Sequence, residues 1–134
     1  MPEALETWNE DLFKLRLPRI YQIIHEINER FCHMVWERFP GNWSRISEMA
    51  IIADGNVRMA NLAVVASHRV NGVSKIHSDI LVNSTFKNFY RIWPEKFDNV
   101  TNGIAHRRWL CYSNPALSAL VEDCIGDGFK KRPQ

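Results

Sequence analysis

The sequence predicts a mainly α-helical protein that carries a short β-hairpin. Three observations predict this fold class: an apolar stripe at helical spacing over residues 18–39, a well-capped helix pattern over residues 114–125, and an Asp54-Gly55 pair between two β-like runs. The chain has 134 residues, of which 46% are hydrophobic and 24% are charged. This length and composition are those of one globular domain with a core of its own.

Charge and cysteine content narrow the function classes. Lys and Arg outnumber Asp and Glu by 17 to 15, and a net charge of +2 does not favour nucleic acid or a membrane surface as a partner. No apolar run approaches the about 20 residues that cross a bilayer, and the first residues do not form a signal peptide. The three cysteines, Cys32, Cys111 and Cys124, form no C-x-x-C pair and indicate reduced thiols in a cytoplasmic protein.

The helix over residues 18–39 has the clearest pattern in the chain. Pro18 suits its first turn, and Pro40-Gly41 ends it. His25 and His33 lie eight residues apart on it, whereas two metal ligands on one helix face are three or four apart, so no metal site is predicted. Its apolar side chains recur at helical spacing: Ile20, Ile23, Ile24, Ile27, Phe31, Met34 and Val35. Residues 3–6, upstream of this helix, also have a helix-like sequence.

Three short elements are expected next. Asn42 is a good N-cap for a short helix over residues 42–49. Asp54-Gly55 predicts the turn of a hairpin over residues 51–59, which should pack on a helix because a lone hairpin is marginal in water. The apolar run over residues 60–66 is read as a helix, although periodicity alone does not separate a buried helix from a buried strand here.

Residues 67–81 organise the rest of the chain. The apolar run leads to Asn71-Gly72, which we interpret as a turn, and a short amphipathic segment over residues 75–81 follows. A turn between a buried element and a new helix brings backbone N–H groups to a surface, where they can hold a polar ligand. For an isolated Asn-Gly pair, a tight turn between two core elements is the favoured interpretation.

The last third of the chain combines aromatic residues, a second Asn-Gly pair and a final helix. A helical face is shared by Phe86, Phe89, Tyr90 and Trp93, for which core packing is favoured over an aromatic binding platform. Residues 96–100 are polar and predicted to form a loop before Asn102-Gly103. Asn114 as N-cap, Pro115 at the first position and Gly126 after the end predict a helix over residues 114–125, followed by a frayed tail over residues 129–134.

The residues alone give no self-contained catalytic set. Glu3 and Glu6 have helical spacing, but such pairs are usually a solvated face, and nothing indicates the raised pKa that acid–base work on a glycoside needs. His68, His77 and Asp79 lack metal-ligand spacing, and no glycine-rich phosphate-binding motif occurs. Without a resemblance to known proteins, the residues therefore predict only a helical protein with two Asn-Gly pairs, the second followed by Arg-Arg-Trp.

Taken together and in order, these segments resemble the glycogen and maltodextrin phosphorylases, the α-glucan phosphorylase family. The resemblance covers nearly the whole chain, and its most specific part is NGV, IHSDIL and TNGI followed by RRW, within residues 71–109. Its other parts are PEALETW at residues 2–8, LPRIYQIIHEINERF at residues 17–31, FKNFY at residues 86–90 and NPALSALVEDCIG at residues 114–126.

The resemblance implies a fold and an activity. The chain would be a fragment of the two-lobed, Rossmann-like α/β architecture of these glycosyltransferases. Residues 1–102 would end the N-terminal lobe, residues 103–134 would begin the C-terminal lobe, and the active site would lie between the lobes. The family cleaves α-1,4-glucan ends with inorganic phosphate and releases glucose 1-phosphate with retained anomeric configuration. Its cofactor is pyridoxal phosphate, whose phosphate group takes part in proton transfer.

The resemblance also implies roles for single residues. Asn102 matches the asparagine whose amide holds the 6-hydroxyl of the reacting glucosyl unit, Val73 matches a valine beside that hydroxyl, and Trp109 matches a tryptophan near the cofactor. Three residues match positions beside the sugar on its β-face: Glu3, Ala4 and Glu6. The sequence departs from the family pattern at Ala105-His106, where many relatives have Thr-Pro, which leaves the local turn there open.

What the matched segments omit predicts an incomplete site. The family histidine that touches the 6-hydroxyl falls just before Pro2, and the cofactor lysine and the phosphate-binding lysine and arginine fall downstream. We therefore expect no complete catalytic set, no pyridoxal phosphate bound by this chain alone, and no activity of this chain alone. The alternative is a stand-alone helical binding or interaction module without catalysis. For the fragment we also expect self-association through exposed apolar helix faces.

Overall fold

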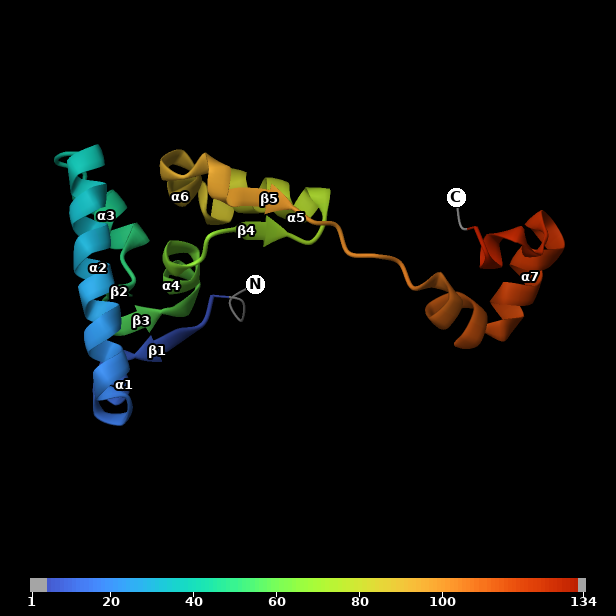
Figure 1. Ribbon diagram of the computed structural model, residues 1–134, viewed down its shortest axis with the longest axis horizontal. Coiled ribbons are helices and arrows are strands. Elements are labelled where there is room, and N and C mark those ends of the chain that lie inside the picture. Colours follow the sequence, from blue (N-terminus) through green and yellow to red (C-terminus); the bar gives the residue numbers. More distant parts are fainter. Residues whose placement is uncertain (1–4, 133–134) are drawn as a thin grey trace. The chain divides into compact units, whose positions relative to one another are not determined.

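The structure of the protein, a computed structural model, describes residues 5–132. It divides into two units, Met1–Val100 and Thr101–Gln134, which are described separately (Figure 1). Both are mainly helical, as the sequence predicts. The first carries two small sheets, of which the sequence predicts only one hairpin. Glu3 and Ala4 lie outside the described residues, so the site roles predicted for them have no structural counterpart here.

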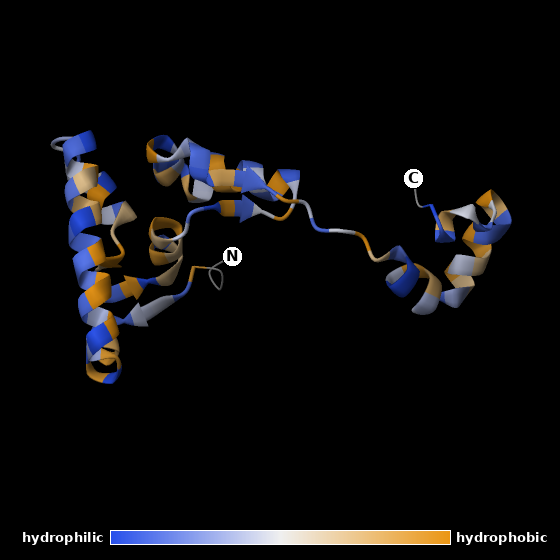
Figure 2. Ribbon diagram, in the orientation of Figure 1, coloured by the Kyte–Doolittle hydropathy of each residue, from blue (hydrophilic) through white to orange (hydrophobic). Residues whose placement is uncertain are grey.

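Helix α2 (Pro18–Arg38) is the longest element of the first unit, and its predicted bounds are confirmed to within one residue. Its apolar face buries Ile24, Phe31 and Val35, and Figure 2 shows this face of α2 in orange against a blue outer face. Ile20 and Ile23 are 46% and 48% exposed, so the buried stripe is narrower than predicted. The other residues of the stripe pack in two buried clusters of this unit, one around Phe31 and Val35 and one around Ile24.

The predicted hairpin is confirmed as β2 (Ile52–Ala53) paired antiparallel with β3 (Asn56–Arg58). Asp54 and Gly55 have φ angles of 53° and 70°, the left-handed pair that a tight two-residue hairpin turn requires. The free edge of β3 pairs antiparallel with β1 (Thr7–Asn9), which gives a three-stranded sheet in the order β1-β3-β2. The helix-like interpretation of residues 3–6 is wrong for the described Leu5 and Glu6, which are not helical and lead directly into β1.

Two asparagine side chains fasten this sheet to the helices around it. Asn28, buried on α2, accepts the backbone N–H groups of Ile51 and Ile52 through Oδ1 at 2.9 and 3.1 Å. Asn61 points its amide nitrogen at three carbonyl oxygens around the end of α3, those of Glu48, Met49 and Ala50. Both anchors satisfy backbone groups that a short sheet beside a helix end otherwise leaves without partners.

The helices around the sheet follow the sequence prediction closely. Asn42 accepts the N–H of Arg45 and caps α3 (Trp43–Met49), as expected. The apolar run after the hairpin is α4 (Met59–Ala66), also as predicted. Helix α1 (Glu10–Arg16) was not predicted; the Asn9 side chain caps it, and Glu10 accepts a hydrogen bond from Tyr21 that, with Lys14 close by, lowers the pKa of the Glu10 carboxyl.

Core packing of the aromatic residues after residue 85 is confirmed. Phe89 on α6 (Lys87–Ile92) is buried, and its ring stacks on Phe31 of α2 with centroids 5.8 Å apart. Trp93 packs on the same Phe31 ring at 5.6 Å. Tyr90 lies at the margin, 38% exposed, with its ring edge against Phe97. These contacts join α6 to α2 through one aromatic cluster.

The two segments that were predicted as a turn and a loop form strands instead. Strand β4 (Val70–Gly72) pairs in parallel with β5 (Phe97–Asn99), in the register Val70↔Phe97 and Gly72↔Asn99. Between them lie α5 (Lys75–Ile80), a π-helical turn (Leu81–Thr85), α6 and a 3₁₀ turn (Pro94–Lys96). The predictions of an Asn71-Gly72 turn and of a loop over residues 96–100 are wrong, because each strand is specified by a partner about 27 residues away along the chain.

The second unit holds a π-helical turn (Arg107–Tyr112), α7 (Pro115–Ile125) and a 3₁₀ turn (Asp127–Lys130). The predicted caps of α7 are confirmed: Asn114 accepts the N–H of Leu117 at 3.1 Å, and Gly126 has a φ of 78°. Lys130 pairs with Glu122 at 2.6 Å, so its part of the tail is held rather than frayed. The apolar face of α7 is largely uncovered, with Leu117 and Leu120 at 43% and 59% exposure.

Among the described residues, no helix is both long enough and apolar enough to cross a bilayer.

Candidate functional site

The candidate site is the edge of the first unit where the parallel strands β4 and β5 end. The backbone N–H of Val100 donates to the carbonyl oxygen of Gly72 at 3.0 Å, one step beyond the Gly72↔Asn99 pair. The chain therefore leaves both strands side by side, toward Val73 after β4 and toward Thr101 after β5. In open α/β sheets, ligands bind outside the carboxyl ends of the strands.

Gly72 is required here because the chain passes close to α5. A Cβ atom at this position would lie 2.6 and 2.7 Å from the backbone N and Cα atoms of Ser78. The backbone of Gly72 is not left-handed, so the glycine serves close approach rather than a turn. Gly103, in the second Asn-Gly pair, has open space around a Cβ position and no left-handed φ, so neither reason for a glycine applies to it within its own unit.

Ser78 ties α5 to the end of β5. Its Oγ atom lies 2.7 Å from Oδ1 of Asn99 and 3.0 Å from the carbonyl oxygen of Ser74. A hydroxyl has one proton, so Ser78 donates to one of the two oxygens, and rotating the Asn99 amide lets its NH₂ group donate to Ser78 instead. This contact holds α5 against the end of β5.

Val73 sits directly at this edge and is 42% exposed. Its backbone N–H donates to Nδ1 of His77 at 3.2 Å, while the backbone N–H of His77 donates to Oγ of Ser74 at 3.2 Å. The sequence analysis singled out Val73 but missed His77 and Ser78 as its supports. The Ser-x-x-His spacing resembles a helix-capping pattern and is the one trace of this arrangement in the sequence.

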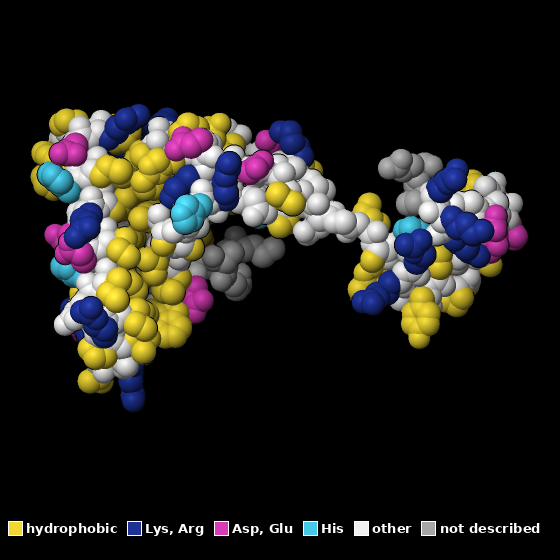
Figure 3. All heavy atoms as spheres, viewed as in Figure 1, with side chains coloured by type: hydrophobic (Ala, Val, Ile, Leu, Met, Phe, Trp, Pro, Cys, Tyr) yellow, Lys and Arg dark blue, Asp and Glu magenta, His cyan; other side chains and the backbone are white. Residues whose placement is uncertain are grey.

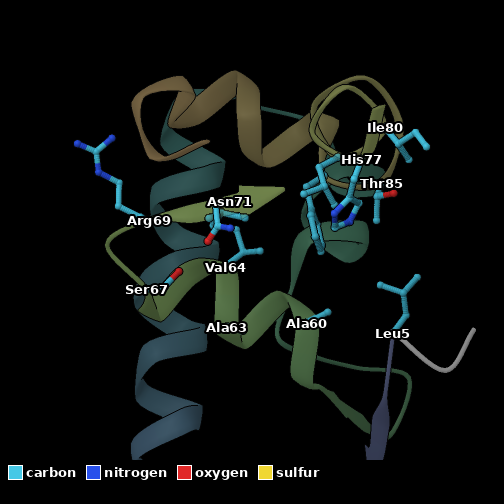
Figure 4. Close-up of a pocket in the computed structure, with 13 residues that line it drawn as sticks. Leu5, Ala60, Ala63, Val64, Ser67, Arg69, Asn71, His77, Ile80 and Thr85 are labelled. Carbon is cyan, nitrogen blue, oxygen red and sulfur yellow. The ribbon is translucent and has the colours of Figure 1, made fainter. Parts of the chain in front are cut away.

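A cavity of about 840 Å³ lies beside this edge, within the first unit. Figure 4 shows His77 and Asn71 reaching into it, whereas Arg69 points away and donates to the carbonyl oxygen of Glu95 at 3.0 Å. The lining is mainly apolar and comprises Leu5, Ala60, Ala63, Val64, Ser67, Arg69, Val70, Asn71, His77, Ile80, Leu81, Thr85 and Phe86. Hydrophobic side chains also gather on the visible surface of this unit in Figure 3.

Glu6 belongs to the same unit, one residue after the cavity-lining Leu5. Its carbonyl oxygen accepts the N–H of Met59 at 3.0 Å, and its exposed carboxylate accepts the indole N–H of Trp8 at 2.7 Å. Of this segment's described residues, Glu6 is therefore bonded to the start of α4, and Leu5 lines the cavity.

The predicted site residues of the second unit are exposed. Asn102 lies in residues 101–105, which have no regular secondary structure. Trp109 is 71% exposed on the π-helical turn, where its backbone N–H donates to the carbonyl oxygen of Ala105 at 3.0 Å. The structure thus gives these two residues no buried surroundings within their own unit.

Other reactive groups of the described chain have structural roles. Lys96 donates to the carbonyl oxygens of Val64 and Val65 at 3.0 Å each, and burial lowers the pKa of its amine. Burial raises the pKa of the Cys32 thiol, which makes it a poor nucleophile. Among residues 5–132, no three His, Cys, Asp or Glu side chains gather as a metal site would require.

Parallel strands with helices between them, inside a mainly helical segment, are typical of a piece of an α/β protein. Comparison with known families identifies it: the carbohydrate phosphorylase model matches residues 1–134, and the chain belongs to this family. Its relatives include the glycogen phosphorylase of Bacillus subtilis (strain 168), which is 57% identical over 134 residues, 100% of this chain.

Two further relatives show how broad the similarity is. The glycogen phosphorylase of Synechocystis sp. is 47% identical over 98% of this chain, and the human muscle form of glycogen phosphorylase is 47% identical over 96% of it. The chain spans 17% of the length of the Bacillus subtilis protein and 16% of the other two. The chain therefore corresponds to a fragment of a phosphorylase, and the family resemblance predicted from the sequence is confirmed.

Proposed function

We propose that this chain forms the glucosyl-binding edge of an α-glucan phosphorylase, which cleaves α-1,4-glucan ends with inorganic phosphate and releases glucose 1-phosphate. The observation that carries the proposal is the parallel pairing of β4 and β5, whose carboxyl ends lie side by side. This pairing fits the two-lobed Rossmann-like architecture expected from the sequence. In that architecture, residues 1–102 would end the N-terminal lobe and residues 103–134 would begin the C-terminal lobe.

Val73 and Asn102 are the proposed sugar contacts of this edge. Val73 follows β4 directly. Asn102 is assigned to the same sugar hydroxyl as Val73 by its match to the family asparagine. A carboxamide both donates and accepts hydrogen bonds, which suits a sugar hydroxyl. Both residues would position the 6-hydroxyl of the terminal glucosyl unit and carry no charge in the reaction.

Glu6 is proposed to lie beside the β-face of the sugar, together with Glu3 and Ala4, which are outside the described residues. The support for Glu6 is its fixed backbone, bonded to Met59, and its place next to the cavity-lining Leu5. The indole N–H of Trp8 donates to one carboxylate oxygen of Glu6 at 2.7 Å, so the other oxygen can accept a hydrogen bond from a sugar hydroxyl.

Trp109 is proposed to contact pyridoxal phosphate, which would supply a phosphate group for proton transfer. The lysines of the second unit do not fit as its covalent attachment. Lys130 pairs with Glu122, whose carboxylate raises the pKa of the amine, whereas a Schiff-base lysine has to be a neutral nucleophile. Lys131 is exposed at the end of the 3₁₀ turn. We therefore derive no step through the cofactor, and we propose that this chain alone neither binds it covalently nor is active.

Titration of the ¹⁵N-labelled chain with maltopentaose, followed by NMR, tests the sugar site. We expect weak binding, with a Kd of about 1 mM, and chemical-shift changes of the Val73 amide and the Asn102 side-chain NH₂ group. Asn102→Ala should weaken binding about tenfold, the loss expected for one hydrogen bond of ~1.4 kcal/mol. Asn83→Ala, an exposed asparagine on the π-helical turn, is the matched control and should leave binding unchanged.

The same titration separates this proposal from a stand-alone binding module. The alternative is favoured by the buried clusters within the first unit, which give it a core of its own. A module of that kind predicts no sugar-dependent shift at Val73 or Asn102, and this result would overturn the sugar site. Release of glucose 1-phosphate after addition of phosphate and pyridoxal phosphate would overturn the expected inactivity of the chain.

Self-association is proposed to follow from exposed apolar side chains on α1 and α2. Leu15 is 75% exposed, and Leu12, Ile20 and Ile23 are between 46% and 48% exposed. Large exposed apolar side chains tend to be covered by association. Light scattering should give at least the mass of a dimer at high concentration, and Leu15→Lys with Ile23→Lys should return the monomer mass. A monomer for the unmodified chain would contradict the proposal.

The cellular location is proposed from the cysteines. Cys32, Cys111 and Cys124 are all free thiols in the structure. Free thiols persist in a reducing compartment, which supports the cytoplasm.

A further inference from the structure

The backbone at Val73 is held by a histidine side chain. The N–H of Val73 donates to Nδ1 of His77 at 3.2 Å, and Ser74 at the start of α5 accepts the N–H of His77. In an ordinary capping box the side chain three residues into the helix bonds the N–H of the cap residue itself. Here it reaches one residue further back, to Val73, the residue that projects from the strand edge.

This hydrogen bond requires an unprotonated Nδ1 on His77. A backbone N–H can only donate, so Nδ1 must carry its lone pair, and the proton of the neutral ring must reside on Nε2. A protonated ring presents N–H at both nitrogens and turns the acceptor for Val73 into a second donor. Imidazole is the side chain that ordinarily changes charge between pH 5 and 8.

Within the described residues, the bond from the Val73 N–H is the main polar contact of the His77 ring. On α5, Lys75 and Asp79 pair with each other at 2.7 Å. α5 packs on β4, β5 and the π-helical turn, and Asp98 of β5 is the titratable residue in those elements. Oδ1 of Asp98 accepts the N–H of Asn99 at 2.8 Å. Arg69 borders the same cavity, but its guanidinium is bonded to the Glu95 carbonyl oxygen.

We propose that His77 is a positioning residue that holds Val73 at the strand edge only while its ring is neutral. Protonation of His77 breaks the bond and releases the Val73 backbone, so the edge loosens as the pH falls. The consequence for substrate rests on the proposed function: if Val73 borders the sugar 6-hydroxyl, maltooligosaccharide binding weakens on acidification. Neither the sugar contact nor the helix cap by itself gives this pH dependence.

NMR of the ¹⁵N-labelled 134-residue chain without sugar tests the bond directly. Long-range ¹H–¹⁵N spectra of the ring should show the Nε2–H tautomer at pH 8. Between pH 8 and pH 5, the Val73 amide proton should move with the same midpoint as the His77 ring, and its hydrogen exchange, corrected for pH, should become about fivefold faster, the loss expected for one hydrogen bond. A ring in the Nδ1–H tautomer, or a Val73 amide that does not follow the ring, overturns the proposal.

Two variants separate positioning from helix capping. His77→Gln keeps a neutral acceptor that does not titrate, so Val73 should stay protected and lose its pH response; His77→Ala should leave Val73 unprotected at every pH. His25→Gln, on the exposed side of α2, is the matched control and should leave the Val73 titration unchanged. Equal pH responses of Val73 in the unmodified chain and in His77→Gln overturn the proposal.

A parallel maltopentaose titration at pH 8 and pH 5.5 separates the His77–Val73 bond itself from its effect on sugar binding. Binding that weakens at least about threefold at pH 5.5 in the unmodified chain, but not in His77→Gln, supports the role toward sugar. Absence of binding at both pH values overturns the proposed function and that role, while the sugar-free spectra still decide whether His77 holds Val73.

Discussion

Replacement of Asn28 by alanine is expected to lower the free energy of unfolding of the first unit by about 3 kcal/mol. The Oδ1 atom of Asn28 accepts two backbone N–H groups, at 2.9 Å from Ile51 and 3.1 Å from Ile52. Ile51 is fully buried, so water does not replace the lost acceptor, and each unpaired buried N–H is destabilising by roughly 1–3 kcal/mol. Urea unfolding followed by tryptophan fluorescence measures the effect.

Two further variants assign the loss to the hydrogen bonds of Asn28. Asn28→Asp keeps an oxygen in the same place, and at neutral pH it should retain more of the stability than Asn28→Ala. Glu29→Ala, on the exposed face one residue along α2, should change the stability by less than about 0.5 kcal/mol. A loss of that small size for Asn28→Ala would show that the hairpin does not depend on this anchor.

Asn28 also shows why part of the fold could be read from the sequence and part could not. Its position on the apolar face of α2 follows from the helix period, as the burial of Ile24, Phe31 and Val35 does. Its partners are backbone groups at the start of β2, more than 20 residues away. No local pattern encodes such a contact, and the same holds for β1, which becomes a strand only because β3 offers a free edge.

The cap residues and the hairpin were predictable for the opposite reason. Asn42, Asn114 and the Asp54-Gly55 pair act on backbone groups within four residues of themselves. Such interactions depend on local sequence alone, and each of these predictions is confirmed. The turn prediction at Asn71-Gly72 failed because the same residue types also suit a strand end under close approach, which the sequence does not display.

For the candidate site, the sequence pointed to Val73 but not to the side chains that hold its surroundings in place. Val73 was selected by resemblance, whereas its bond to His77 and the link from Ser78 to Asn99 depend on how α5 folds back onto β4 and β5. The family match over residues 1–134 establishes what the chain belongs to. The roles of Val73, Asn102 and Trp109 stay predictions, and the maltopentaose titrations test those of Val73 and Asn102.

Gly72→Ala is expected to destabilise the first unit by at least about 2 kcal/mol and to separate α5 from the strand ends. The added Cβ would lie 2.6 Å from the backbone N and 2.7 Å from the Cα of Ser78, and no side-chain rotation relieves contacts with backbone atoms. The measurements are urea unfolding and amide hydrogen exchange, in which Val100 should lose its protection because its N–H bonds to the Gly72 carbonyl oxygen.

The second Asn-Gly pair provides the matched control for Gly72. Gly103→Ala places the same methyl group after the same residue type, but no heavy atom lies within 4 Å of it. It should change the stability by less than about 0.5 kcal/mol. Adding Ser78→Ala to Gly72→Ala should not restore stability, because the Ser78 backbone N and Cα remain in place. Equal effects of Gly72→Ala and Gly103→Ala would mean that backbone freedom, rather than the contact with α5, selects glycine at the strand edge.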